Sequence, residues 1–169
     1  MNRFLKPIEL VANVLIIVVA VLCLGAVAQK YLRPAQPAPP GVKIPSVGDR
    51  ISSLDINWST HSKNVLLVLQ AGCHYCTESA DFYRTLVQQA KGKDVSVTAV
   101  LPQSSEEAGK YMNKLQLSDI AVKQSSLDAL DVSGTPTVIL ADEKGRITNV
   151  WVGKLPSNQQ KDVLASLLE

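Results

Sequence analysis

The sequence has few of the residues on which several kinds of functional site depend. Its 169 residues include three cysteines, two histidines, two tryptophans and two phenylalanines. Lysine and arginine number 17 against 15 aspartates and glutamates, and they form no basic stripe within residues 46–169. This balance gives no indication of nucleic-acid binding. No internal repeat is visible, which argues against a repeat array.

Charge is absent from one long segment near the N-terminus. Residues 10–29 are 20 consecutive positions without a charged side chain, and about 20 apolar residues in a helix span a hydrocarbon core of about 30 Å. We therefore predict a transmembrane helix that anchors the chain in a lipid bilayer. The alternative is a cleaved signal peptide, because Ala26-Val27-Ala28 is an A-x-A site. Both interpretations place the rest of the chain outside the cytoplasm, on the periplasmic or extracellular face.

Proline is concentrated just after this segment. Residues 34–45, PAQPAPPGVKIP, contain five prolines in 12 positions, which favours polyproline II over hydrogen-bonded structure. We predict four parts: a short tail over 1–9, the anchor over 10–29, a linker over 30–45 and one folded domain over 46–169. The last part has 124 residues, which suits a single core.

The pattern of the folded part alternates strands with helices. Val65–Leu69 is apolar throughout, as expected of a central strand covered on both faces. An amphipathic helix follows from Cys76 and ends at Gly92. The remaining predicted elements are a short strand or hairpin over Val47–Thr60, a strand over Val95–Leu101, a helix from Ser104 to Leu115, an extended piece over Ile120–Lys123, a helical turn over Ser126–Leu130, a hairpin of Thr137–Ala141 with Ile147–Val152, and a last helix.

Two helix starts carry capping signals. Ser104 with Glu107 predicts a capping box, and Ser157 with Gln160 predicts another at the last helix. The buried side of that last helix is expected to hold Val163, Leu164, Leu167 and Leu168. The order of elements predicts an α/β fold with a mixed sheet flanked by helices, in which the strands joined by helices pair in parallel and the final hairpin is antiparallel.

The segment Cys73-His74-Tyr75-Cys76 carries the strongest chemical signal. Two thiols with two residues between them can close into a disulfide and reopen, which makes a two-electron redox pair. A purely structural disulfide is a weaker interpretation, because so small a ring adds only about 2 kcal/mol. A zinc site of these residues with His61 fits poorly, because Cys73 and His74 are adjacent. We expect neither a metal nor a cofactor.

The chain resembles membrane-anchored, extracytoplasmic thioredoxin-like proteins of the redoxin and TlpA-like kind. The likeness rests on Val47-Gly48-Asp49, on Cys73-His74-Tyr75-Cys76, and on Gly134-Thr135-Pro136-Thr137 with the strand after it. It implies a thioredoxin fold with an N-terminal strand or hairpin extension. Three positions depart from the pattern: Gly72 replaces a tryptophan, Leu67 a buried aspartate and Ser79 an acidic residue.

The resemblance implies roles for six residues. Cys73 is expected at the N-terminus of a helix, where the helix end and His74 favour its thiolate form. Cys76 is expected to be more buried and to resolve the mixed disulfide. Thr135 and Pro136, joined by a cis peptide bond, and Tyr75 are expected to contact the substrate, with the Thr135 backbone pairing with an extended peptide.

These features predict a thiol–disulfide oxidoreductase acting on extracytoplasmic protein thiols and disulfides. Its partners would be those substrates and a membrane-bound thiol electron donor or acceptor. The two sulfurs alone leave the direction open, and Thr135 and the anchor favour a reductase. The alternative is a redox-passive module that presents a peptide-binding groove.

Overall fold

The computed structural model describes residues 44–168 and, nearer the N-terminus, Leu15, Ile17 and Val19. The chain divides into two units, Met1–Pro39 and Pro40–Glu169. Leu15, Ile17 and Val19 are helical and exposed. Among the described residues, none of the helices combines the length and the apolar character of a membrane span. Most of the predicted anchor and linker lies outside these residues, so the anchor and the four domain boundaries stay predictions.

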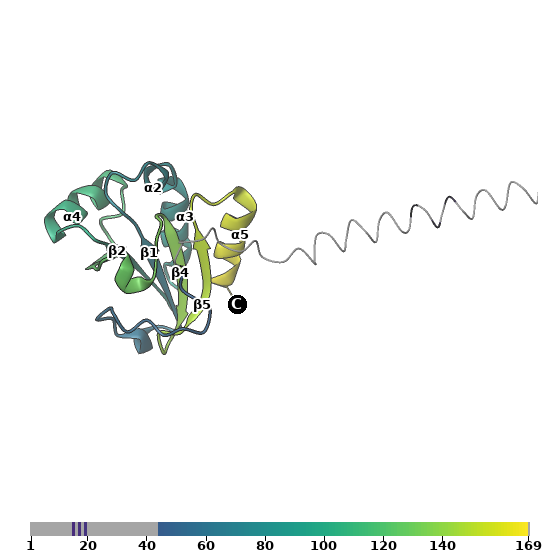
Figure 1. Cartoon of the computed structure of the whole chain (residues 1–169), viewed down its shortest axis with the longest axis horizontal. Helices are drawn as coiled ribbons and strands as arrows, with labels where there is room; N and C mark the ends of the chain where they lie inside the picture. The colour runs from purple at the N-terminus through teal and green to yellow at the C-terminus, as the bar shows by residue number, and fades with distance from the viewer. Residues whose placement is uncertain (1–14, 16, 18, 20–43, 169) are drawn as a thin grey trace, which may run out of the picture. The chain divides into compact units, whose positions relative to one another are not determined.

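The second unit is built on a mixed sheet with the order β3-β2-β1-β4-β5 (Figure 1). β1 and β2 are parallel, as are β2 and β3, whereas β4 runs antiparallel to both β1 and β5. The strands are β1 (Lys63–Val68), β2 (Val95–Leu101), β3 (Ala121–Gln124), β4 (Thr137–Asp142) and β5 (Ile147–Val152). The thioredoxin-like α/β fold is therefore confirmed, with a central β1 that is buried from Asn64 to Val68.

Helices and short turns connect the strands. They are η1 (Trp58–Thr60), α2 (His74–Glu78), α3 (Ala80–Ala90), α4 (Ser105–Lys114), η2 (Asp128–Leu130) and α5 (Ser157–Ser166). Ser104 caps α4 as predicted, since its side chain accepts the N–H of Glu107. The predicted cap at α5 is wrong: Pro156 is the N-cap residue, and the side-chain amide of Gln160 donates to the carbonyl of Leu155 at 2.9 Å instead.

Side chains that alternate along the strands build two apolar layers. Val65 and Leu67 of β1 face a layer that includes residues of α3, α4 and α5. Leu66 and Val68 face a smaller layer on the other side of the sheet, closed by Ile51, Leu54 and residues near η2. The alternation follows from the two-residue period of a strand. At α5, Val163 and Leu167 are buried but Leu168 is exposed, contrary to the prediction.

The N-terminal extension differs from the predicted strand or hairpin. Residues 47–60 make one isolated bridge, between Arg50 and Arg146, and otherwise form loop and the η1 turn. Ile51 and Leu54 are both buried, and their spacing of three cannot point to one face of a strand, whose period is two. The segment therefore covers the sheet as a loop rather than extending it.

The predicted helix after the cysteines is broken into α2 and α3. Ser79 is the residue between them, with φ −91° and ψ 5°. Its hydroxyl donates to the carbonyl of Tyr75 at 2.8 Å. A serine side chain that bonds the carbonyl four residues earlier often bends a helix. The apolar spacing continues through the break, which is why the sequence pattern alone predicted one helix.

Candidate active site

A tight turn connects the central strand β1 to the segment that holds the two cysteines. The N–H of Cys73 donates to the carbonyl of Gln70 at 3.1 Å, and Gly72, the third residue of the turn, has φ +83°. A turn with a positive φ at its third position strongly prefers glycine. A tryptophan at this position would have a strained backbone. The conformation of the turn therefore explains why glycine stands at position 72 instead of tryptophan.

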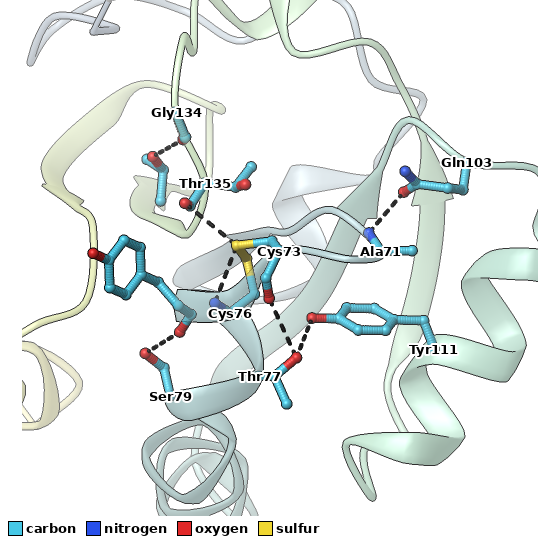
Figure 2. Close-up of a disulfide and its surroundings, with 11 residues drawn as sticks. Ala71, Cys73, Cys76, Thr77, Ser79, Gln103, Tyr111, Gly134 and Thr135 are labelled. Carbon is cyan, nitrogen blue, oxygen red and sulfur yellow. Dashed lines mark hydrogen bonds between the residues drawn. A yellow bond between two sulfur atoms is a disulfide. The ribbon is translucent and has the colours of Figure 1, made fainter.

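Cys73 and Cys76 form a disulfide at the start of α2 (Figure 2). Cys73 is the N-cap residue of α2, and its sulfur accepts the N–H of Cys76 at 3.1 Å. Cys76 is completely buried in the apolar layer beneath, whereas Cys73 is only partly buried. The two sulfurs thus differ in access: Cys73 can meet a partner from solvent, and Cys76 can react only from within.

The loop before β4 packs directly against the disulfide. The carbonyl oxygen of Thr135 lies 3.5 Å from the sulfur of Cys73, and the Thr135–Pro136 peptide bond is cis, as the resemblance implies. The carbonyl of Pro136 accepts the N–H of Gly153 at 2.7 Å. This bond joins the loop to the end of β5. The structure therefore brings Cys73, Thr135 and Pro136 together, as predicted.

The two residues between the cysteines project outward. The side chain of His74 is 77% exposed, and Tyr75 is 57% exposed. Their ring centroids lie 5.6 Å apart with the planes tilted by 58°. An exposed tyrosine beside a reactive sulfur offers a large amphipathic contact surface for an incoming chain. The positions of both residues fit the predicted roles, which stay predictions.

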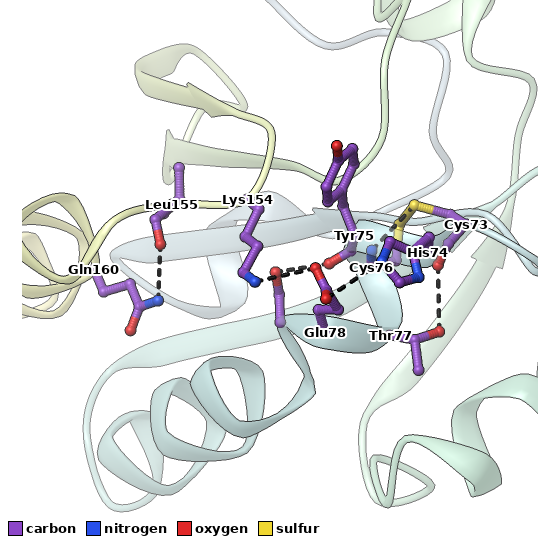
Figure 3. A network of polar contacts seen from close by, with 10 residues as sticks. Cys73, His74, Tyr75, Cys76, Thr77, Glu78, Lys154, Leu155 and Gln160 are labelled. Atoms are coloured by element: carbon purple, nitrogen blue, oxygen red, sulfur yellow. Dashed lines mark hydrogen bonds and ion pairs between the residues drawn. A yellow bond between two sulfur atoms is a disulfide. The ribbon is translucent and has the colours of Figure 1, made fainter.

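A carboxylate that sequence reasoning did not single out also lies at this site. Glu78 has one oxygen 3.3 Å from Nε2 of His74 and the other 3.0 Å from Nζ of Lys154 (Figure 3). The hydrogen bond from Lys154, with the charge of His74, holds the pKa of Glu78 below its ordinary value. The spacing of four between His74 and Glu78 is a sequence signal for such a contact. Nothing in the sequence links Glu78 to Lys154.

An aliphatic side chain and a hydroxyl group occupy the two interior positions where the resemblance expects acids. Leu67 is completely buried, and Ser79 is buried with its hydroxyl bonded to Tyr75. The neighbouring Tyr83 is also buried, and its hydroxyl has no hydrogen-bond partner among the described residues. Burial raises the pKa of Tyr83. Positions 67 and 79 therefore provide no buried carboxylate that could accept a proton from Cys76.

The other flank of the cysteines is formed by α4 and the loop before it. The hydroxyls of Thr77 and Tyr111 lie 3.3 Å apart, and the side chain of Gln103 accepts the N–H of Ala71 at 3.2 Å (Figure 2). An open groove of about 520 Å³ lies here. It is lined by Ala71, Gln103, Glu107, Lys110, Tyr111 and Lys114. Sequence reasoning did not single out these residues, because the contacts join positions more than 30 residues apart.

Metal binding was the alternative that joined the cysteines with His74 and His61. Within the described part of the chain, no group of three or more histidine, cysteine, aspartate and glutamate side chains is placed to hold a metal ion. Both cysteine sulfurs are engaged in the disulfide, and a thiolate is the form in which cysteine binds a metal.

Most of the sequence matches the model of a known protein family. The redoxin family model matches residues 34–168, which is most of the chain. No curated protein matches the sequence.

Similar solved structures share the fold at low sequence identity. One is described as the thiol:disulfide interchange protein DsbE from Chlorobium tepidum (TM-score 0.62, 19% identity, 75% of this chain and 100% of that one). A second is a thiol-disulfide isomerase from Corynebacterium glutamicum (TM-score 0.56, 21% identity, 80% and 99%). A third is StoA from Bacillus subtilis (TM-score 0.53, 19% identity, 75% and 98%). These likenesses show the fold.

Proposed function

Because this chain belongs to the redoxin family of thioredoxin-like oxidoreductases, we propose that Cys73 and Cys76 are a redox-active pair that exchanges disulfides with protein substrates. One observation carries the proposal: the two cysteines form a disulfide in which Cys73 is only partly buried and Cys76 is completely buried. The exchange requires this asymmetry, because one thiol must meet the substrate and the second must act from inside. The names of the similar structures, an interchange protein and an isomerase, support the same chemistry.

The proposed reaction has two steps. The Cys73 thiolate attacks a sulfur of the substrate disulfide, a Cys73–substrate bond forms, and the other substrate sulfur leaves as a thiolate that takes a proton from water. The Cys76 thiolate then attacks the Cys73 sulfur and releases the second substrate thiolate. The substrate gains two electrons and two protons, and the protein pair is oxidised to its disulfide. The reverse sequence oxidises a substrate dithiol.

Residues around Cys73 are proposed to hold the substrate and to activate the sulfur. The backbone of Thr135 would pair with an extended substrate segment beside Cys73, with Pro136 holding the loop in place. The exposed ring of Tyr75 would contact side chains next to the substrate cysteine. The N–H of Cys76, 3.1 Å from the Cys73 sulfur, would stabilise the thiolate, and His74 would add to this when it is protonated.

We propose the reductive direction, with electrons returned by a membrane-bound thiol donor. The uncharged segment 10–29 supports a location at a membrane, with residues 46–169 outside the cytoplasm. The interchange protein among the similar structures fits such a location. Fractionation of cells tests it: the full chain is expected in the membrane fraction, and protease added to spheroplasts should cleave it.

The reduction potential of the Cys73–Cys76 pair tests the proposed activity. The full-length protein would be equilibrated in glutathione buffers and its free thiols counted by alkylation. A reductase is expected to have a potential below that of the glutathione couple, and it should reduce insulin disulfides when supplied with dithiothreitol. A potential well above the glutathione couple would reverse the direction. A pair that resists both reductant and oxidant would leave the redox-passive peptide-binding module as the better description.

A further inference from the structure

Glu78 uses both of its carboxylate oxygens, and each contacts a different part of the site. One oxygen meets His74 within α2, and the other meets Lys154, which lies in the loop after β5 (Figure 3). The side chains of Glu78 and Lys154 are 37% and 49% exposed, so the ion pair is partly shielded from solvent. Since the pKa of Glu78 is lowered by Lys154, the carboxylate is charged at neutral pH.

The contact between Glu78 and Lys154 closes a ring of contacts that includes Cys73. The sulfur of Cys73 touches the carbonyl of Thr135 at 3.5 Å. The next residue, Pro136, accepts the N–H of Gly153 at 2.7 Å. Lys154 follows Gly153 in the chain and reaches back at 3.0 Å to Glu78 of α2. Three segments that are distant in the sequence, 73–78, 135–136 and 153–154, are therefore linked in a circle.

The helix α2, which forms one side of this ring, has few other side-chain contacts to neighbouring elements among the described residues. α2 has five residues, of which only Cys76 is buried. The disulfide joins Cys73 to Cys76 at the two ends of a single turn, so it does not tie α2 to another element. On one flank the hydroxyl of Thr77 meets Tyr111 of α4. On the other flank, Glu78 and Lys154 provide the contact that the described residues show between α2 and the loop after β5.

We propose that Glu78 and Lys154 are a positioning pair that holds α2 against the Thr135–Pro136 loop during disulfide exchange. The inference rests on the proposed function of Cys73 and Cys76. An exchange needs the attacked and attacking sulfurs in line, and displacements as small as about 1 Å can slow a reaction greatly. Neither member of the pair touches a sulfur, so the pair acts through the placement of α2.

The test compares single substitutions with a charge swap in the full-length protein. Glu78→Gln and Lys154→Met each remove one charge, and the double variant Glu78→Lys with Lys154→Glu restores the pair in reverse. Insulin disulfides serve as substrate with dithiothreitol as donor, and kcat and KM are measured separately. Each single variant is expected to lower kcat about two- to fivefold, the range that a partly exposed ion pair supports. KM should change little, and the swap should recover most of kcat.

A matched control is available in the turn between β4 and β5. Glu143 and Lys144 form an ion pair at 3.9 Å whose side chains are 52% and 71% exposed, and it lies outside the ring. Glu143→Gln and Lys144→Met are expected to leave kcat unchanged. Circular dichroism at 25 °C checks that every variant is folded, and the swap keeps the test valid if a single variant is not.

Three outcomes would overturn the inference, and a fourth concerns the proposed function alone. Single variants with unchanged kcat would show that the pair does not position α2. A higher KM with unchanged kcat would make Glu78 or Lys154 a substrate contact instead. A swap as slow as the single variants would mean that the identity of each residue matters, rather than the pairing. If the wild-type chain itself exchanges no disulfide, the proposed function fails before this comparison begins.

Discussion

The sulfur of Cys73 lies 3.5 Å from the carbonyl oxygen of Thr135, although 62 positions separate the two residues. The same sulfur accepts the N–H of Cys76 at 3.1 Å. These contacts have opposite effects once the disulfide is reduced. A carbonyl can accept a hydrogen bond only from the neutral thiol, whereas an N–H donor stabilises the thiolate. The N–H contact is the shorter one, and the helix end adds to it, so we expect the thiolate to be favoured.

The first prediction concerns the reactivity of Cys73. In a Cys76→Ser variant, which keeps the donating N–H at position 76, the pKa of the Cys73 thiol should lie below the ordinary value of about 8.5. The rate of alkylation by iodoacetamide, measured from pH 4 to pH 10, gives the midpoint. His74→Ala in the same background should raise the midpoint modestly. A midpoint at or above about 8.5 would remove Cys73 as the attacking thiol.

The second prediction concerns the buried hydroxyl of Tyr83. This group has no hydrogen-bond partner among the described residues, and an unpaired buried hydroxyl costs stability that a phenyl ring does not. Tyr83→Phe should therefore leave the free energy of unfolding unchanged or raise it by about 1 kcal/mol at pH 7. Urea titration followed by circular dichroism measures this. A loss of more than about 1 kcal/mol would reveal a partner for the hydroxyl.

The same tyrosine should affect stability at alkaline pH. Burial raises the pKa of Tyr83, whereas an unfolded tyrosine ionises near pH 10. The folded state therefore binds a proton that the unfolded state releases, and stability falls as the pH rises above about 10. Below that pH the contribution is fully present. Tyr83→Phe should lose less stability between pH 9 and pH 11 than the wild type does, in the same urea titrations.

Much of the fold follows from local patterns in the sequence. β2 spans Val95–Leu101 as predicted, because β-branched and apolar residues fill every position except Ser96 up to Pro102, which cannot donate to the sheet. The break at Ser79 was missed because the apolar spacing is the same with or without it. The loop over 47–60 was predicted as a short strand or hairpin because its apolar and polar residues alternate loosely, which is the pattern of a half-buried strand.

The site was predictable only where residues are close in sequence or belong to a known pattern. The spacing of Cys73 and Cys76 marks a redox pair, and the resemblance brought Thr135 and Pro136 beside it. The ion pair of Glu78 and Lys154 joins positions 76 apart, and its residues are of types that usually lie free on a surface. Such a contact depends on how the loop after β5 packs against α2, and no local sequence pattern predicts that packing.

The last prediction separates the roles of the two cysteines. Cys76→Ser should trap substrates and Cys73→Ser should not. Without Cys76 the accessible Cys73 still attacks a substrate disulfide, but nothing inside the protein can resolve the mixed disulfide. Without Cys73 the remaining Cys76 is completely buried and should react slowly. Non-reducing gels of cells that express each variant should show additional bands, removed by reductant, for Cys76→Ser alone.

The double variant Cys73→Ser with Cys76→Ser is the matched control, because any band that it produces cannot come from this pair. Bands from Cys73→Ser alone would reverse the two roles and would require Cys76 to become exposed when the disulfide is absent. If each single variant is folded and neither forms bands, Cys73 does not attack protein disulfides under those conditions. The site would then be better described as a peptide-binding surface, and Tyr75 and the backbone of Thr135 would be the contacts to test next.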